Sequence, residues 1–129
     1  MSVEIGETEK LFNLREAKQL LPLVRSVTLD YRERLEPVQN RLNKMLSNDP
    51  RRRVVEKEFE QIVSRWKEKI EQLGPTVYGL WVVEFDVGEG WLSWRYPEVG
   101  LNFFRARQQT FANRTRLSRY IEDTDPDWA

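Results

Sequence analysis

The residue types best suited to binding chemistry are concentrated in residues 101–119. This stretch holds five arginines and no acid, so its formal charge is 5 − 0 = +5. A guanidinium donates hydrogen bonds in a fork that matches phosphate and carboxylate groups, and nearby aromatic rings can stack on it or on a base. The pattern indicates a site for an anionic small ligand or nucleic acid. The arginines are Arg105, Arg107, Arg114, Arg116 and Arg119, and the interleaved aromatic residues are Phe104, Phe111 and Tyr120.

The alternative is that acids of the same chain neutralise these arginines. Glu84, Asp86 and Glu89 come before the stretch, and four acids follow it in the tail. The whole chain has 21 Lys+Arg and 21 Asp+Glu, so no global field draws it to nucleic acid or to a membrane. We therefore favour internal pairing and keep the anion site as the rival interpretation.

Catalysis would have to depend on carboxylates, because the chain contains no Cys and no His. These absences exclude thiolate nucleophiles, imidazole bases and zinc–thiolate sites. Glu84 and Asp86 lie on the same face of a predicted strand, about 7 Å apart, which would suit acid–base work or an oxygen-ligated cation. Such pairs are common on solvent-facing strands without any role, so we predict no catalytic residue, no metal and no cofactor.

A sheet must position these residues, and we expect it to be a small three-stranded antiparallel meander within residues 76–107. Its strands are predicted at Val77–Val87, Trp91–Tyr96 and Leu101–Arg107, which are rich in aromatic and β-branched residues and separated by turns. Gly88 suits a type II′ turn, which pairs Val87 with Gly90. One face is then apolar, with three cross-strand pairs and two further residues of the third strand: Phe85–Leu92, Val83–Trp94, Trp81–Tyr96, Leu101 and Phe103.

The opposite face of this meander, called the second face below, is a candidate binding surface. The same register places Glu84 diagonal to Arg95 and Arg95 opposite Asn102, with Trp91 and Phe104 as aromatic neighbours. Polar clusters ringed by aromatic side chains are typical of ligand pockets and of interface hot spots. The alternative is a covered face, with the Phe111 loop or the terminal helix folded over it.

The first part of the chain predicts a long amphipathic helix. Asn13 and Glu16 have the spacing of a capping box, and apolar residues recur every three or four positions over Val24–Met45. Because proline lacks an N–H, Pro22 is expected to end a short first helix, either as a kink or as the start of a second one. Pro37 is expected to bend the long helix.

A second long helix is predicted after a short connector, Ser47–Pro50. Its apolar stripe runs over Val55–Leu73, and Gly74-Pro75 stops it with a left-handed cap. Two stripes joined by a short connector predict an antiparallel helical hairpin over residues 12–74. Arg51-Arg52-Arg53 at the helix start could touch an acidic partner, but we interpret it as a solvated helix corner.

These elements predict a single α+β domain, in which the helical hairpin packs on the meander. Residues 1–11 are expected to be a flexible leader, and residues 108–129 a loop, a short helix near Arg114–Ile121 and an acidic tail. The apolar runs are far too short to span a bilayer, so we expect a cytoplasmic protein with no membrane contact.

Six short motifs follow one another between residues 12 and 117: Phe12–Ala17, Leu20–Val24, Val83–Phe85, Leu92–Glu98, Phe103–Arg105 and Phe111–Arg114. In this order they resemble a prokaryotic domain-of-unknown-function family (number twenty-two zero three). The resemblance implies a fold and no established activity. Where the family usually has Cys, Trp-His-Glu and Gly, this chain has Ser93, Phe104-Arg105-Ala106 and Thr110, so any chemistry of the family's His and Glu is lost here.

We therefore expect a non-catalytic domain that associates with itself, as a homodimer, or with another protein through the second face and the arginine-rich loop. The rival function, from a different class, is binding of an anionic small ligand or nucleic acid at the same arginines. Salt sensitivity separates the two, because phosphate contacts weaken steeply with salt. The candidate residues for either function are Glu84, Trp91, Arg95, Asn102, Phe104, Arg105, Arg107, Phe111 and Arg114.

Overall fold

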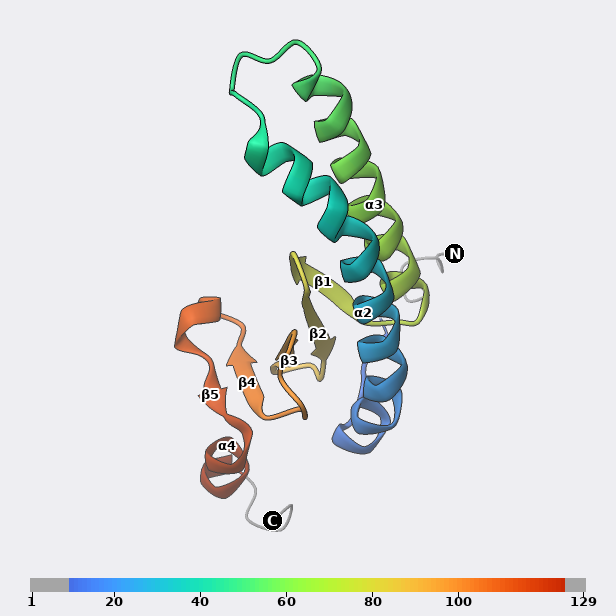
Figure 1. Ribbon diagram of the computed structural model, residues 1–129. Coiled ribbons are helices and arrows are strands. Elements are labelled where there is room, and N and C mark those ends of the chain that lie inside the picture. Colours follow the sequence, from blue (N-terminus) through green and yellow to red (C-terminus); the bar gives the residue numbers. More distant parts are fainter. Residues whose placement is uncertain (1–9, 125–129) are drawn as a thin grey trace, which may run out of the picture.

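A computed structural model describes residues 10–124, with side chains to residue 121, and shows a helical hairpin packed against an antiparallel sheet (Figure 1). The sheet has five strands rather than the predicted three. The elements are α2 (Leu14–Lys44), α3 (Arg52–Gln72), β1 (Thr76–Gly79), β2 (Val82–Asp86), β3 (Gly90–Arg95), β4 (Phe103–Ala106), the 3₁₀ helix η1 (Phe111–Asn113), β5 (Thr115–Arg116) and α4 (Leu117–Thr124).

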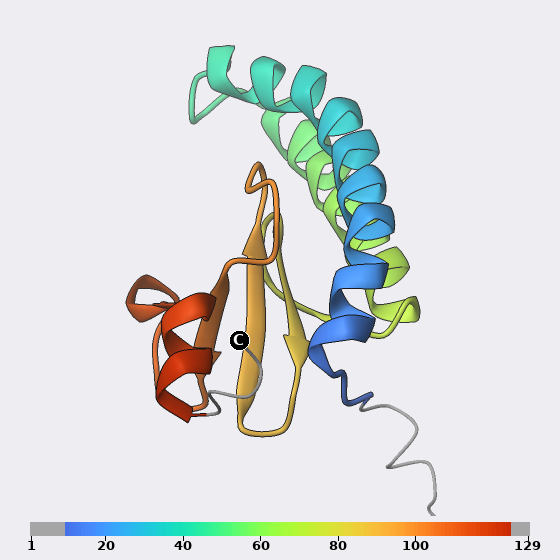
Figure 2. The ribbon, with the colours of Figure 1, turned by 90° about the horizontal axis from the view of Figure 1, so that it is seen from below.

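Helix α2 begins with the predicted capping box. The Oδ1 atom of Asn13 accepts from the Glu16 backbone N–H at 2.8 Å, and Oε1 of Glu16 accepts from the Asn13 N–H at 3.1 Å. The alternative in which a second helix starts at Pro22 is wrong, because α2 is one helix that continues through both Pro22 and Pro37. Both prolines are on the exposed side, so carbonyls without an intrahelical partner can bond to water while the buried stripe continues. The hairpin curves along its length, as expected when bonds on the solvent side are interrupted (Figure 2).

Helix α3 returns antiparallel to α2, and Trp66 anchors the pair. Trp66 is fully buried, and its indole Nε1–H donates to the Oγ1 atom of Thr28 at 3.0 Å. The connector end of the hairpin extends beyond the sheet (Figure 1). Nearby acids neutralise two of the arginines at the start of α3, because Arg51 pairs with Asp49 at 3.0 Å and Arg52 pairs with Glu56 at 3.1 Å.

One extra strand, β1, comes from a reversal inside the first predicted strand, where Gly79 is the nearest turn-type residue. The predicted strand Val77–Val87 is in fact the β1–β2 pair, joined at Leu80 and Trp81, where Trp81 has φ of 62°. Both residues at the reversal are large and apolar, and neither is a typical turn residue. The fifth strand, β5, pairs with β4.

The predicted register of β2 and β3 is confirmed. Phe85 lies opposite Leu92 and Val83 lies opposite Trp94, and the Val87 N–H donates to the Gly90 carbonyl at 2.9 Å. These apolar pairs, with Trp66 and residues of α2, form the core.

The predicted register of β3 and β4 is wrong by one residue. Phe104 lies opposite Leu92, and Phe103 lies opposite Ser93. Since successive side chains alternate between faces, Phe104 is buried on the apolar face and Phe103 is on the second face. Phe104 stacks on Tyr120 of α4, with ring centroids 3.7 Å apart, so α4 closes this end of the core.

Candidate interaction site on the second face

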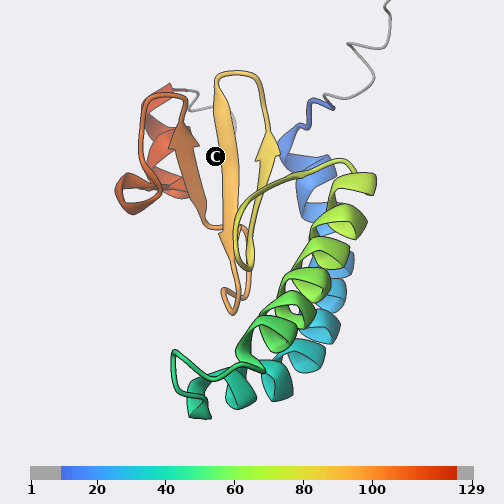
Figure 3. The same ribbon diagram turned by 90° about the horizontal axis from the view of Figure 1, so that it is seen from above.

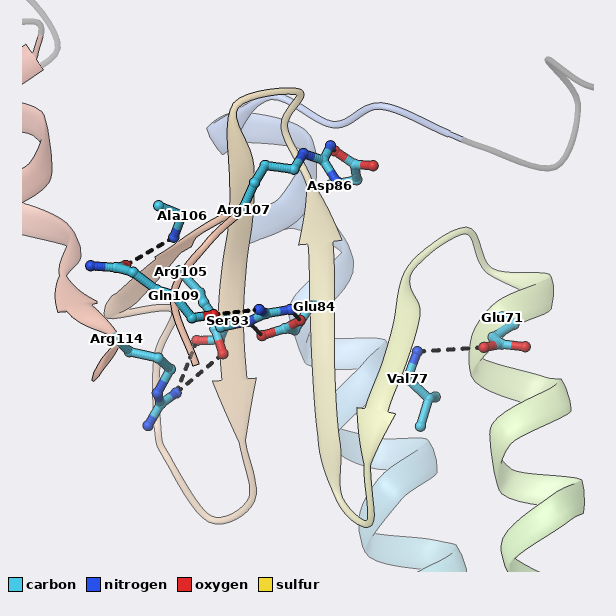
Figure 4. Close-up of polar contacts among 10 residues, drawn as sticks. All are labelled: Glu71, Val77, Glu84, Asp86, Ser93, Arg105, Ala106, Arg107, Gln109 and Arg114. Atoms are coloured by element: carbon cyan, nitrogen blue, oxygen red, sulfur yellow. Dashed lines mark hydrogen bonds and ion pairs between the residues drawn. The ribbon is translucent and has the colours of Figure 1, made fainter. Parts of the chain in front are cut away.

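A buried ion pair crosses the centre of the second face. The Nε and Nη2 atoms of Arg105 donate to Oε2 and Oε1 of Glu84 at 2.8 and 2.7 Å, and the third nitrogen donates to the Gln109 carbonyl at 2.8 Å (Figure 4). Arg105 is 7% exposed and Glu84 is 1% exposed. The hydrogen bonds that Arg105 donates to Glu84 raise the pKa of Arg105 above its ordinary value even though burial opposes this. This guanidinium is therefore charged, and each of its three nitrogens already donates a hydrogen bond.

Aromatic rings enclose the same guanidinium. The Cζ atom of Arg105 lies 4.5 Å from the ring centroid of Tyr78 and 4.2 Å from that of Trp91. Arg107 stacks on the same Trp91 ring at 4.3 Å and pairs with Asp86 at 2.6 Å. Cation–π contacts of this kind are strongest where water is excluded. The rings and guanidiniums therefore hold each other in place.

A second arginine cluster is centred on Arg114. Its guanidinium pairs with Glu98 at 2.8 Å and lies 4.1 Å from the ring centroids of both Phe103 and Phe111. Its Nη1 also approaches the hydroxyl of Ser93 at 3.4 Å (Figure 4). Phe111, carried by η1, stacks on Tyr78 at 5.8 Å and so joins the two clusters. The Phe111 loop therefore lies over the part of the second face around Tyr78 and Arg114, whereas α4 packs on Phe104 of the apolar face.

Two predicted site residues lie elsewhere. Phe104 is in the core, as the shifted β4 register requires. Asn102 precedes β4 and is exposed, and its backbone carbonyl accepts from the Leu117 N–H at 2.7 Å. Arg95 instead lies opposite Val82, and its guanidinium lies 5.5 Å from the Phe111 ring.

Tyr78, Glu98 and Gln109 are among the site residues that were not predicted as members. Tyr78 is not in the predicted set because the sequence predicts β1 and β2 as a single strand, although Gly79 next to Tyr78 is an available turn signal. Glu98 was assigned to a turn, but its carboxylate is the partner of Arg114. Gln109 was assigned to a loop, and its Oε1 accepts from the Ala106 backbone N–H at 3.0 Å, which holds the loop against β4.

The arrangement leaves a rigid surface with a small positive charge. Five arginines belong to the face and its rim (residues 95, 105, 107, 114 and 116), and three acids pair with them (residues 84, 86 and 98), which gives 5 − 3 = +2. Arg95 and Arg116 are the exposed arginines at the rim, making ring contacts at 5.5 and 5.8 Å. The carboxylates of Glu84 and Asp86 each bind a different arginine, so they do not act as a pair.

Two searches of the described residues concern other kinds of site. Between residues 10 and 121, no group of three or more His, Cys, Asp or Glu side chains is arranged to hold a metal ion. None of the helices in this part of the chain combines the length and the apolar character that crossing a bilayer requires.

The comparisons with known proteins give one match. A family described as "Uncharacterized conserved protein (DUF2203)" matches residues 10–117, which include the helical hairpin, strands β1 to β5 and the arginine clusters. The comparison with curated proteins found no match, and neither did the comparison with solved structures.

Proposed function

The chain belongs to the DUF2203 family of uncharacterised conserved proteins, and we propose that it is a non-catalytic protein-interaction domain whose second face docks an acidic segment of a partner protein. The observation that carries this proposal is the preorganised state of the face. The guanidiniums of Arg105 and Arg114 are locked by carboxylates and rings, so binding would cost little side-chain entropy.

The exposed composition of the face also supports docking of a protein. Tyr, Trp and Arg are the residues most enriched among interface hot spots. Tyr78 is 48% exposed, and Trp91 is half-buried between β2 and β4 with the Arg107 side chain 42% exposed over it. A partner could contact these rings without any rearrangement of their side chains.

The charge of the face favours an acidic partner over a second copy of the chain. A twofold dimer would place this face against itself, and a surface of net +2 would then oppose a surface of net +2. An acidic segment would instead meet Arg95 and Arg116 at the rim. Anionic small ligands have less to bind here, because the best enclosed guanidiniums already hold carboxylates.

Charge reversal at the rim tests the proposal. The wild type, the double variant Arg95→Glu/Arg116→Glu and the control Lys67→Glu on exposed α3 would be immobilised and used to capture proteins from a cell lysate. We expect an acidic protein retained by the wild type and by the control but lost from the double variant, with purified components binding in the same order. Equal capture by all three proteins would contradict docking on this face.

Two further measurements separate the rival functions. Light scattering should find a monomer, and a dimer that Arg95→Glu/Arg116→Glu strengthens would show that the face binds itself. A thermal-shift panel of nucleotides, oligonucleotides and phosphate at low and high salt should be flat, because saturation at 100 times Kd would otherwise stabilise the fold by about 2.7 kcal/mol. A salt-sensitive shift that Arg95→Glu/Arg116→Glu abolishes would favour the anion site.

A further inference from the structure

A polar cleft separates the distal half of α2 from the tips of the sheet. It has a volume of about 380 Å³, within the range of small-ligand pockets. The helical wall is a stripe of α2 formed by Arg32, Glu36 and the carboxamide residues Gln39, Asn40 and Asn43. The aromatic wall lies beside the ends of two strands and is formed by Trp81, Tyr96 and Pro97. The curved hairpin arches over this end of the sheet (Figure 3).

The helical wall is not explained by helix stability. Asn is a poor helix former, and Asn40 stands inside α2 at an exposed position where Ala, Lys or Glu would serve the helix better. Among the described residues, no hydrogen bond links the carboxamides of Gln39, Asn40 or Asn43 to another side chain or to the backbone. Their donors and acceptors are therefore open to a ligand.

In the wall formed by Trp81, Tyr96 and Pro97, the backbone of Trp81 is strained. Trp81 has φ of 62°, a left-handed conformation that is strained for a bulky residue and that tends to persist where function requires it. The strain is held by its surroundings: the Trp81 carbonyl accepts from the Tyr96 N–H at 3.0 Å, and its ring lies 4.9 Å from that of Trp66. Arg32 lies over the Tyr96 ring at 4.9 Å and completes this wall.

The spacing of the helical wall matches an extended polypeptide. A carboxamide has the donor and acceptor of a peptide unit, so each one can bond to a peptide main chain in both directions. Gln39 and Asn43 are four residues apart, which is about 6 Å along a helix. Peptide units that face the same side of an extended chain repeat at about 6.6 Å. The wall from Arg32 to Asn43 is about 16 Å long and would accommodate about five extended residues.

We propose that this cleft binds an extended, uncharged peptide segment of a partner, with an apolar side chain placed against Trp81 and Tyr96. An uncharged segment suits the cleft, because the charges of Arg32 and Glu36 cancel and the carboxamides are neutral. The cleft lies at the strand tips beside α2 and shares none of its lining residues with the second face, so this binding is separate from the docking proposed above.

A displayed library of random seven-residue peptides tests the proposal on the full chain. The baits are the wild type, Asn40→Ala/Asn43→Ala, and Gln61→Ala as a control on exposed α3. Because alanine favours a helix, the double variant should keep its fold, which circular dichroism would verify. We expect the wild type to enrich peptides with few charges and at least one apolar residue. Synthetic versions should bind Gln61→Ala as they bind the wild type, and bind the double variant at least tenfold more weakly.

Nuclear magnetic resonance locates the bound peptide. The indole signal of Trp81 and the carboxamide signals of Asn40 and Asn43 should shift on titration, while the indole of Trp91 should not. Peptide binding should also persist in Arg95→Glu/Arg116→Glu, which keeps this result independent of the second face. The proposal is overturned if the wild type enriches no peptide beyond the double variant, or if the enriched peptides shift Trp91 instead of Trp81.

Discussion

Arg105 and Glu84 join two strands that are not neighbours, because their bidentate ion pair passes from β4 to β2 over the intervening β3 (Figure 4). The residue of β3 beneath this pair is Ser93, which is paired with Glu84 in the ladder and fully buried. Its small side chain leaves room for the guanidinium to reach the carboxylate. The second face is thus tied together across three strands.

Breaking this pair should destabilise the fold strongly. Glu84→Gln leaves the buried Arg105 guanidinium without its counter-charge, and we expect a loss of about 3–5 kcal/mol in the free energy of unfolding. The double variant Glu84→Leu/Arg105→Met removes both charges and should recover most of this loss. Urea denaturation measures both effects, and a cost for Glu84→Gln below about 1 kcal/mol would show that water reaches the pair.

The pH dependence of the same pair has a definite sign. Because the pKa of Arg105 is raised in the folded protein, its contribution is fully present below the ordinary arginine pKa and is lost only as pH rises through the folded value. Urea midpoints of the wild type and Arg105→Met should therefore differ by a constant amount between roughly pH 6 and pH 9. A difference that shrinks over this range would contradict the assignment.

The β3–β4 pairing leaves no room for a side chain at Gly90. A Cβ atom there would lie 2.5 Å from the Arg105 carbonyl oxygen and 2.5 Å from the Phe104 ring. Gly90→Ala should cost about 1–3 kcal/mol, as overpacked sites do. Gly79→Ala is the matched control, because its Cβ would meet no atom within 4 Å, and thermal unfolding should separate the two variants clearly.

Trp94 tests the register of the core. It is fully buried opposite Val83, and its Nε1–H donates to the Glu98 carbonyl at 2.7 Å. Trp94→Ala should cost about 3–5 kcal/mol. A denaturant melt that shows less than about 1 kcal/mol would mean that this side chain is not in the core.

The hydrogen bond between Trp66 and Thr28 links the two long helices where both side chains are fully buried. Thr28→Val keeps the shape but removes the acceptor, so the indole N–H is left unsatisfied at a cost of about 1–3 kcal/mol. Thr28→Ser keeps the hydroxyl and should cost less than Thr28→Val in the same urea titration. Equal losses for the two variants would assign the effect to packing alone.

The predictable part of the fold is the part with strong local rules. The capping box at Asn13 and the two-residue turn at Gly88 each specify one geometry, so the start of α2 and the β2–β3 register followed from the sequence. The β3–β4 register did not, because the tight turn spans Arg95 to Glu98, where the Glu98 N–H donates to the Arg95 carbonyl at 2.8 Å, and residues 99–102 then lie outside the strands. Because successive side chains of a strand point to opposite faces, this one-residue error placed Phe103 on the apolar face and Phe104 on the second face, the reverse of what the structure has.

The candidate site was predictable in composition but not in geometry. The alternation of Glu84 and Asp86 with apolar residues placed both acids on the second face, and their pairing with arginines was expected from charge balance. The enclosure of Arg105 was not, since it needs Tyr78, whose strand is separated from β2 by the reversal at Leu80 and Trp81. The alternation of residues in the sequence predicts which face of a strand a side chain lies on. Ring stacking depends in addition on which strands are adjacent in the sheet.

The strand order β1-β2-β3-β4-β5 has a kinetic consequence. Every neighbour in the sheet is also the next strand along the chain, so each pairing closes a short loop, and proteins dominated by such local contacts fold quickly. The bond from the Phe12 N–H to the Asp86 carbonyl, at 2.7 Å, instead joins residues 86 − 12 = 74 positions apart. The chain entropy lost in closing that loop places it late in folding, after the hairpins have formed. Substitutions at Phe12 should therefore speed unfolding and leave the folding rate almost unchanged.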